Sequence, residues 1–163
     1  MTEMPKTCFF TGHRFINPDD ISMIKSRLNE EILNAVNNGF THFISGGALG
    51  FDTIAAEQVI FMRENYNEIR LIMYLPCTDQ SKNWSEFERI RYDNILSVAD
   101  EIYYVSHEPY KKGCMKKRNC EMAEASDMCI AYLKSMPSGT AQTVKIAKNK
   151  GIDVINIAEN SIL

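Results

Sequence analysis

Short apolar runs alternate along the chain with longer segments in which apolar residues recur every three or four positions. The short runs predict buried strands at 6–11, 41–45, 70–75, 101–105, 128–133 and 153–157. The longer segments predict helices at 21–36, 52–66, 87–99 and 141–150, and residues 111–126 hold basic residues followed by a helical stretch. Strands and helices that alternate through short links favour right-handed crossover connections between parallel strands. The pattern therefore predicts an α/β fold, doubly wound around a mostly parallel sheet whose strand order the sequence leaves open.

The overall composition is that of an ordinary single domain. The chain has 163 residues, 45% of them hydrophobic, so we expect one domain over 1–163. A net charge of -3 provides no global attraction to nucleic acid or to a membrane. The five cysteines form no CxxC pair, no leader pattern precedes them, and no apolar run reaches the roughly 18 residues of a membrane span. We expect a cytoplasmic protein with reduced thiols, no membrane partner and no metal site.

Three loops that contain glycine follow predicted strands, at Thr11–Arg14, Ser45–Asp52 and Pro137–Thr140. A strand that turns into a helix through glycine presents unpaired backbone N–H groups and the positive end of the helix dipole, which together bind anions. The carboxyl ends of parallel strands lie at one edge of a sheet. We therefore expect the three loops to converge on one phosphate-bearing ligand at that edge.

The middle loop is the strongest binding candidate of the three. Gly46 and Gly47 directly follow Ser45, and Gly50 opens the next helix, so backbone without a Cβ is available to a phosphate or a ribose. A purely structural role is also open, because a turn from strand to helix often needs glycine for a positive φ or for close packing. The loop matches neither the GxGxxG fingerprint nor the P-loop motif. Asp52 has two roles open to it, capping of the helix or acceptance of hydrogen bonds from ligand hydroxyls.

The first and third loops add charged and hydroxyl groups. Arg14 follows a strand end and directs a guanidinium at the same edge, where it suits a phosphate or a carboxylate. The neighbouring His13 is either an acid or base or a structural hydrogen-bonding residue. Thr140, after Ser138 and Gly139, places a hydroxyl beside free N–H groups and is also suited to capping the helix.

Two further features leave binding and structural roles open. Basic residues gather in one short stretch, at Lys111, Lys112, Lys116, Lys117 and Arg118. Such a cluster forms either a solvated surface or an anion-holding loop, and Arg118 with Asn119 is a candidate for direct ligand contact at a helix start. Trp84 is the single tryptophan, suited equally to the core and to stacking on a base from the irregular segment 76–85.

The ordered set of motifs resembles the YpsA-like branch of the SLOG superfamily over residues 6–158. The residues that carry the resemblance are Phe10–Arg14, Ser45–Asp52, Trp84, Arg118 with Asn119, Ser126 with Asp127, Ala131 with Tyr132, and Ser138–Ala141 with Thr143. The resemblance implies a Rossmann-like three-layer fold and a nucleotide or nucleotide-derived ligand such as ADP-ribose or NAD, with no certain cofactor. It also implies a homodimer, a form that many SLOG proteins take, without marking the interface.

Two departures from related patterns bear on activity. The last loop has Ser138 where family members usually carry glycine, which reduces the freedom of the backbone there. The related lonely guy phosphoribohydrolases use a catalytic glutamate in a PGGxGTxxE motif, and Thr143 occupies that position in this chain. A threonine provides no carboxylate chemistry at neutral pH, so we predict that the protein is not a phosphoribohydrolase of that mechanism.

We therefore predict a sensor or binding module that holds a nucleotide-like ligand at the carboxyl edge of the sheet. The predicted ligand-binding residues are Gly12, His13, Arg14, Ser45, Gly46, Gly47, Gly50, Asp52, Trp84, Arg118, Asn119, Ser138, Gly139 and Thr140, with no catalytic residue assigned. One alternative is single-stranded nucleic-acid binding, because Ser45–Asp52 is similar to the SGxAxGID segment of DNA-processing protein A, another SLOG member. The other alternative is a nucleotide-processing hydrolase that uses Asp52 or Glu57 as its carboxylate. The two residues are five positions apart on a predicted helix, which places their carboxylates at different angles and disfavours a shared site.

Overall fold

A computed structural model describes residues 4–158 of the chain, in which strands and helices alternate as the apolar pattern predicts. The strands are β1 (Lys6–Gly12), β2 (Phe40–Ser45), β3 (Arg70–Leu75), β4 (Glu101–Tyr104), β5 (Met128–Tyr132) and β6 (Asp153–Asn156). The α-helices are α1 (Ile21–Asn37), α2 (Phe51–Arg63), α3 (Glu86–Val98), α4 (Cys114–Glu124) and α5 (Gly139–Asn149). A short 3-10 helix, η1 (Pro18–Asp20), precedes α1.

The strands form one sheet in the order β4-β3-β2-β1-β5-β6, and every pairing is parallel. The α/β prediction is confirmed, and the sheet is fully parallel rather than mostly parallel. The chain moves outward from β1 to β4 and then returns through α4 to place β5 on the other side of β1. This reversal makes the carboxyl ends of β1 and β5 neighbours, at the position where open α/β sheets generally bind ligands.

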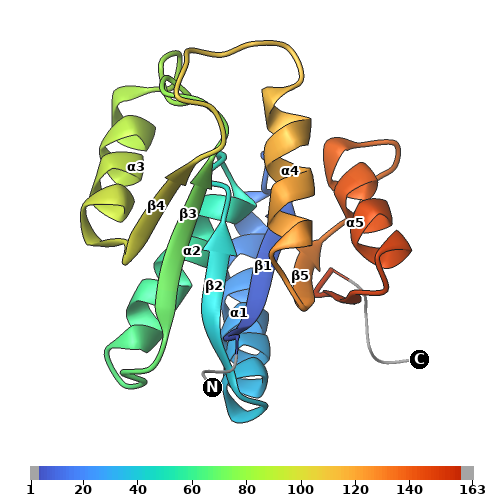
Figure 1. Cartoon of the computed structure of the whole chain (residues 1–163). Helices are drawn as coiled ribbons and strands as arrows, with labels where there is room; N and C mark the ends of the chain where they lie inside the picture. The colour runs from blue at the N-terminus through green and yellow to red at the C-terminus, as the bar shows by residue number, and fades with distance from the viewer. Residues whose placement is uncertain (1–3, 159–163) are drawn as a thin grey trace.

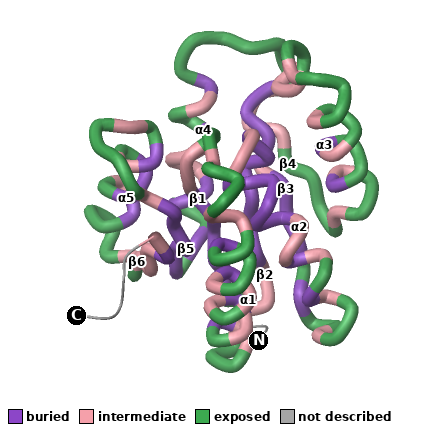
Figure 2. Tube along the Cα trace, turned by 180° about the vertical axis from the view of Figure 1, so that it is seen from behind, coloured by how far each residue is buried: buried purple, intermediate pink, exposed green. Residues whose placement is uncertain are grey.

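Two layers of helices cover the sheet, with α1, α2 and α3 on one face and α4 and α5 on the other (Figure 1). Because both faces are covered, β1 is buried along most of its length, and β5 is buried at every position (Figure 2). The strands end at the upper edge in Figure 1, and the connection 105–113 between β4 and α4 arches over that edge. The confirmed architecture is therefore a three-layer, Rossmann-like fold.

A close backbone contact joins the segments that follow β1 and β2. Gly50 has a φ of +77° and lies so near the carbonyl of Arg14 that a Cβ would overlap it. The N–H of Phe51 donates to the carbonyl of His13 at 3.1 Å, which attaches the first turn of α2 to the end of β1. A Cβ at Gly12 would overlap the ring of Phe51. Both glycines therefore permit the close packing at the carboxyl edge.

Local residues explain several helix boundaries. Ser85 accepts a hydrogen bond from the N–H of Glu88 at 3.2 Å and so caps α3. Gly113, with a φ of +93°, turns the chain into α4, so the helical stretch expected within 111–126 begins at Cys114. Within residues 4–158, no helix has the length and apolar character that crossing a membrane requires.

Candidate functional site

A cavity of about 230 Å³ opens where the strand order reverses between β1 and β5. Its walls come from the segment after β1, the start of α2, the middle of α4 and the start of α5. The lining residues are Thr11, Gly12, His13, Arg14, Ala48, Asp52, Met115, Arg118, Asn119, Met122, Ser138, Gly139 and Thr140. We name this space the arginine cavity, after Arg14 and Arg118. The fold thus brings together residues of all three glycine loops and of the basic stretch.

Arg118 is a buried cation that connects α4 to the ends of two strands. Only 4% of the residue is exposed, and Nη1 donates to the carbonyl of Gly46 at 2.5 Å. Nε donates to Oδ1 of Asn119 at 2.8 Å, and Nη1 also reaches the carbonyl of Tyr74 at 3.4 Å. Burial lowers the pKa of Arg118, while the charge of Asp52 acts in the opposite direction. Arg118 thus adds a positive charge to the cavity wall from a position held by hydrogen bonds.

Asp52 is the carboxylate of the cavity and is 5% exposed. Its Oδ2 accepts a hydrogen bond from the N–H of Ala48 at 3.2 Å. Burial raises the pKa of Asp52 to about 6, an effect partly offset by the charge of Arg118, by the Ala48 hydrogen bond and by the charge of Arg14. The helix-capping role does not apply, because the N-cap of α2 is Gly50. Its role toward ligand hydroxyls stays a prediction.

Arg14 is the exposed cation of the cavity. Among residues 4–158, no hydrogen bond or ion pair engages its guanidinium. Its charge nevertheless contributes to the pKa of Asp52, as does that of Arg118, so the three charged groups act on one space. A free guanidinium beside a buried carboxylate and a buried cation is suited to an anion that also carries hydroxyl groups.

His13 connects the first loop to the third. Its Nε2 accepts hydrogen bonds from the N–H of Lys134 at 2.9 Å and of Ser135 at 3.3 Å. Both bonds need an unprotonated Nε2, and burial together with the charge of Lys134 lowers the pKa of His13. The ring also lies edge-on to Tyr132, with 6.2 Å between the ring centroids. The sequence leaves His13 as either an acid or base or a structural hydrogen-bonding residue, and this geometry corresponds to the structural role.

The third loop begins α5 and stays open toward the cavity. Ser138 caps the helix, since its Oγ accepts from the N–H of Ala141 at 3.0 Å and donates to the carbonyl of Ser135 at 3.0 Å. Thr140 therefore lies inside the helix and does not cap it. Apart from its chain neighbours and the backbone of its own helix, a Cβ added at Gly139 would meet no described atom within 4 Å. Open space at the start of a helix, where N–H groups lack partners, favours an anion.

Part of the middle loop lies behind the cavity wall instead of lining it. A Cβ at Gly46 would overlap the guanidinium of Arg118, and Gly47, with a φ of +71°, packs against Tyr92. Ser45 is fully buried, and its Oγ donates to the carbonyl of Asp52 at 2.9 Å. These residues, like Gly50 in its contact with the first loop, therefore support the site through packing.

Trp84 also lies outside the cavity lining. Its ring is half-buried and packs edge-on against Tyr92 of α3, with 5.1 Å between the centroids. Of the two roles that the sequence leaves open, this contact corresponds to packing against the core.

Four lining residues are not among the predicted ligand-binding residues, namely Thr11, Ala48, Met115 and Met122. Thr11 and Ala48 lie within the first and middle glycine loops, whereas the two methionines lie in no predicted motif. Met115 stands three residues before Arg118, and Met122 stands four residues after it. Residues with this spacing share one face of a helix. Helical spacing around Arg118 is therefore the signal that identifies the two methionines from the sequence.

Of the two carboxylates considered for catalysis, Asp52 lines the cavity, whereas Glu57 is engaged elsewhere. Glu57 forms a two-point ion pair with Arg91 of α3, at 2.6 Å and 2.8 Å, and does not line the cavity. Thr143 is buried and donates to the carbonyl of Gly139 at 3.0 Å. Across residues 4–158, no group of three or more His, Cys, Asp or Glu side chains is arranged to hold a metal ion.

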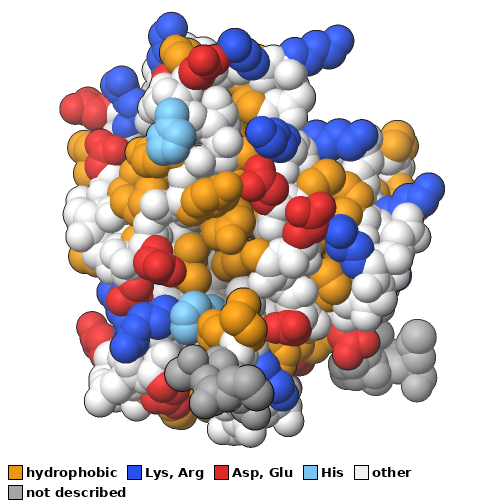
Figure 3. All heavy atoms as spheres, viewed as in Figure 1, with side chains coloured by type: hydrophobic (Ala, Val, Ile, Leu, Met, Phe, Trp, Pro, Cys, Tyr) orange, Lys and Arg blue, Asp and Glu red, His pale blue; other side chains and the backbone are white. Residues whose placement is uncertain are grey.

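The basic stretch lies on the connection over the carboxyl edge and on the first turns of α4. Lys111 pairs with Glu108 at 2.6 Å, while Lys112, Lys116 and Lys117 are exposed and form no ion pair within the described chain. Figure 3 shows Lys and Arg side chains gathered over this upper end of the molecule. Arg118 is the member of the stretch that turns inward, because it is buried against Gly46.

Comparisons with known proteins agree with this architecture. The family model YpsA, described as the YspA SLOG family, matches residues 11–156. A UPF0398 protein of Bacillus cereus strain B4264 is 32% identical over 133 residues, which cover 80% of this chain and 72% of the relative. Structures of DNA-processing protein A from Helicobacter pylori and Streptococcus pneumoniae match 92% and 98% of this chain, with TM-scores of 0.61 and 0.66. At 22% and 21% identity these two support the fold, and the chain spans 64% and 52% of their lengths.

Proposed function

The chain belongs to the YpsA family of SLOG proteins, and on that premise we propose that the arginine cavity binds the phosphate and ribose of a nucleotide or nucleotide-derived ligand. The supporting observation is that Arg14, Arg118, Asp52 and the start of α5 surround one space at the reversal of the strand order. Guanidinium groups and a helix start favour phosphate, and a carboxylate accepts hydrogen bonds from ribose hydroxyls. ADP-ribose and NAD are the first ligands to test.

We propose a binding or sensing module in preference to an enzyme. The lining residues include binding groups but no paired base and nucleophile, since Nε2 of His13 already accepts two backbone hydrogen bonds. A hydrolase remains the second candidate because the pKa of Asp52, about 6, lies near that of an effective acid or base. Mass spectrometry after incubation with ADP-ribose, NAD or AMP separates the two, because only a hydrolase releases a smaller product.

A thermal-shift panel tests the binding proposal. ADP-ribose, NAD and AMP are compared with adenosine, which lacks the phosphate. A ligand at a hundredfold excess over its Kd stabilises the folded state by about 2.7 kcal/mol. We expect at least one phosphorylated ligand to raise the melting temperature while adenosine does not. The absence of a shift with every phosphorylated ligand would contradict the proposal.

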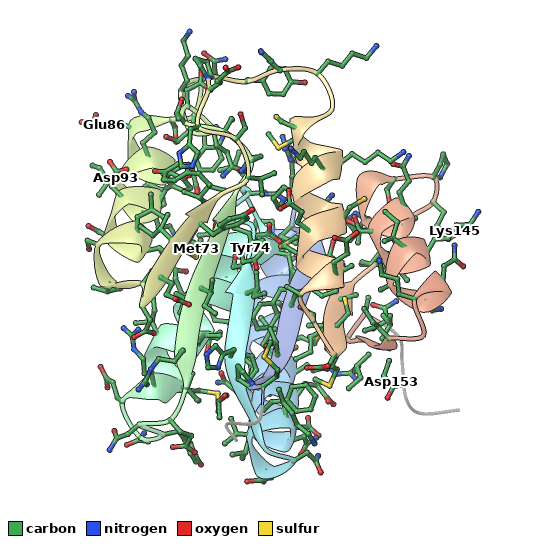
Figure 4. All side chains as sticks on the ribbon, in the orientation of Figure 1. Met73, Tyr74, Glu86, Asp93, Lys145 and Asp153 are labelled. Carbon is green, nitrogen blue, oxygen red and sulfur yellow. The ribbon has the colours of Figure 1, made fainter. Side chains whose placement is uncertain are left out.

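A matched pair of variants locates the binding. Arg14→Gln removes an exposed charge that makes no described hydrogen bond, so the fold is expected to be retained. Because a hydrogen bond to a charged group contributes about 1.5–3 kcal/mol, we expect the affinity to fall roughly tenfold to a hundredfold. Lys145→Gln is the control, since Lys145 is exposed on the outer side of α5 (Figure 4). Equal losses in both variants would place the ligand outside the arginine cavity.

Single-stranded nucleic acid is the alternative partner, and a particular surface favours it. Tyr110 is 58% exposed beside the unpaired Lys112, Lys116 and Lys117, which combines an aromatic ring with phosphate-binding cations. The Helicobacter pylori DNA-processing protein A binds single-stranded DNA. Fluorescence polarisation with a labelled oligothymidine measures such binding. Salt-dependent affinity that disappears when the three lysines become glutamine would support this alternative.

We also propose a cytoplasmic homodimer. Exposed apolar residues on and beside the outer helix α3 are available for an interface, namely Phe87, Ile90, Val98, Ile102 and Tyr103. Most of the cysteines are buried as free thiols, which suits a reducing compartment. Light scattering coupled to size-exclusion chromatography measures the mass, and a monomer across the micromolar range would contradict the dimer.

A further inference from the structure

A second groove adjoins the arginine cavity between α4 and α5. It has a volume of about 260 Å³ and shares Met115, Asn119 and Gly139 with the cavity. Its other lining residues are Tyr110, Gly113, Lys116, Gln142, Thr143 and Ile146. Because the shared residues belong to both walls, the two spaces meet over the open start of α5. We name the second space the α4–α5 groove.

The sizes of the two spaces indicate a ligand that extends across both. Small-molecule sites in proteins usually occupy roughly 300–1,000 Å³. The arginine cavity, at about 230 Å³, and the α4–α5 groove, at about 260 Å³, each fall below that range, whereas together they lie within it. A nucleotide with its phosphate and ribose in the cavity therefore has its base in an adjoining space.

The α4–α5 groove presents unengaged groups of the kind that bind a base. Tyr110 is 58% exposed, and Lys116 and Gln142 are exposed as well. Across residues 4–158, the side chains of these three residues make no hydrogen bond or ion pair. An aromatic ring stacks on any base, and a side-chain amide both donates to and accepts from a base edge. Met115 and Ile146 add apolar surface beside them.

We propose that the α4–α5 groove is the base subsite of the ligand, with the base stacked on Tyr110 and its edge facing Gln142. This assignment rests on the proposed function, because the phosphate in the arginine cavity directs the rest of the ligand toward the shared wall. It also gives the connection 105–113 a role, since that segment carries Tyr110 over the carboxyl edge of the sheet (Figure 1).

A groove on the opposite side of the cavity offers a matched comparison. It shares His13 and Arg14 with the cavity, and Asp20, Tyr132 and Lys134 also line it. Asp20 already accepts hydrogen bonds from Lys134 at 3.3 Å and from the Tyr132 hydroxyl at 3.4 Å, so these polar groups are engaged with one another. Phe15, which is 92% exposed, is the aromatic residue at that side and corresponds to Tyr110.

Titration calorimetry with paired ligands isolates the contribution of the base. Ribose 5-phosphate is compared with the 5′-monophosphates of adenosine, guanosine and uridine, which add only the base. Stacking on an aromatic side chain contributes about 1–3 kcal/mol, so we expect the best nucleotide to bind roughly fivefold to a hundredfold more tightly than ribose 5-phosphate. Tyr110→Ala should remove most of that gain, and Gln142→Ala should reduce it about fivefold. Phe15→Ala should leave the gain unchanged.

The outcomes separate this inference from the function on which it rests. If ribose 5-phosphate binds but no nucleotide binds more tightly, the base subsite is overturned and the proposed function stands. The same holds if the gain survives in Tyr110→Ala, or if Phe15→Ala removes it and thereby places the base in the opposite groove. If none of these ligands binds, the proposed function itself fails.

Discussion

The middle and third glycine loops occupy equivalent positions after β2 and β5, yet their surroundings are opposite. Gly46 and Gly47 in the middle loop are buried, and a Cβ at Gly46 would overlap a side chain. Gly139 in the third loop is exposed, and a Cβ there would meet no described atom within 4 Å other than its chain neighbours and its own helix backbone. A glycine after a strand therefore marks close packing in one case and an open helix start in the other, and long-range neighbours decide between them.

The charged groups around the cavity show the same contrast. Arg118 and Asp52 are buried, and each is held by hydrogen bonds to the middle loop. Arg14 is exposed and, within the described chain, unengaged. The buried charges should therefore affect folding stability as well as ligand affinity, whereas the exposed charge should affect affinity alone.

Removal of the buried cation should have the largest effect on stability. Arg118→Met removes the larger of the two positive charges that act on the buried Asp52, together with the hydrogen bond to the carbonyl of Gly46. We expect a loss of about 3–5 kcal/mol in the free energy of unfolding, measured by urea denaturation. Arg14→Gln is the control, with an expected change within about 0.5 kcal/mol. Similar changes in the two variants would show that the contrast between the charges is wrong.

Alanine substitution of two glycines tests the contrast between the loops directly. At Gly50, alanine would adopt a φ of +77° and overlap the carbonyl of Arg14, so we expect a loss of about 2–4 kcal/mol. At Gly139, alanine has space and a higher helix propensity, so we expect a gain of up to about 1 kcal/mol. Urea denaturation measures both, and a destabilised Gly139→Ala variant would contradict the open third loop.

The pH dependence of stability sharpens the assignment of Asp52. Burial raises the pKa of Asp52 to about 6 in the folded state, compared with about 3.8 in the unfolded chain. The contribution of Asp52 to the free energy of unfolding is therefore fully present below pH 3.8 and is lost as the pH rises through 6. Relative to Asp52→Asn, the unmodified protein should therefore lose about 1 kcal/mol of stability between pH 5 and pH 7. Parallel urea titrations of the two proteins at both pH values measure this loss. If the stability difference between the two proteins did not change with pH, the raised pKa of the buried Asp52 carboxyl would be contradicted.

The smallest expected effect concerns the anchoring of the third loop by His13. His13→Ala removes the acceptor for the N–H groups of Lys134 and Ser135, at a cost of about 1 kcal/mol or less. Hydrogen exchange at these two amides should accelerate. His107→Ala is the control, because that ring contacts Tyr104 instead. Unchanged exchange in His13→Ala would show that another contact holds the loop.

Much of the fold and a large part of the candidate site could be predicted from short segments of sequence. The apolar run at 70–75 coincides with β3, and the helical spacing from Ile21 gives α1. The turn motifs around Arg14 and Gly139, together with Asp52 and Arg118, also meet in one cavity, as convergence at a sheet edge predicts. These predictions succeeded because spacing, caps and turns depend on residues that are close in the chain.

Other features depend on contacts between residues far apart in the chain. The placement of β5 beside β1 and the burial of Arg118 against Gly46 follow no local pattern. The apolar spacing therefore determines the elements and their alternation. Only the tertiary structure decides the strand order and the path of α4, and with them which glycines pack closely and which face open space. The physical reason is that burial of apolar surface and close packing act between whole helices and strands that are distant in the chain.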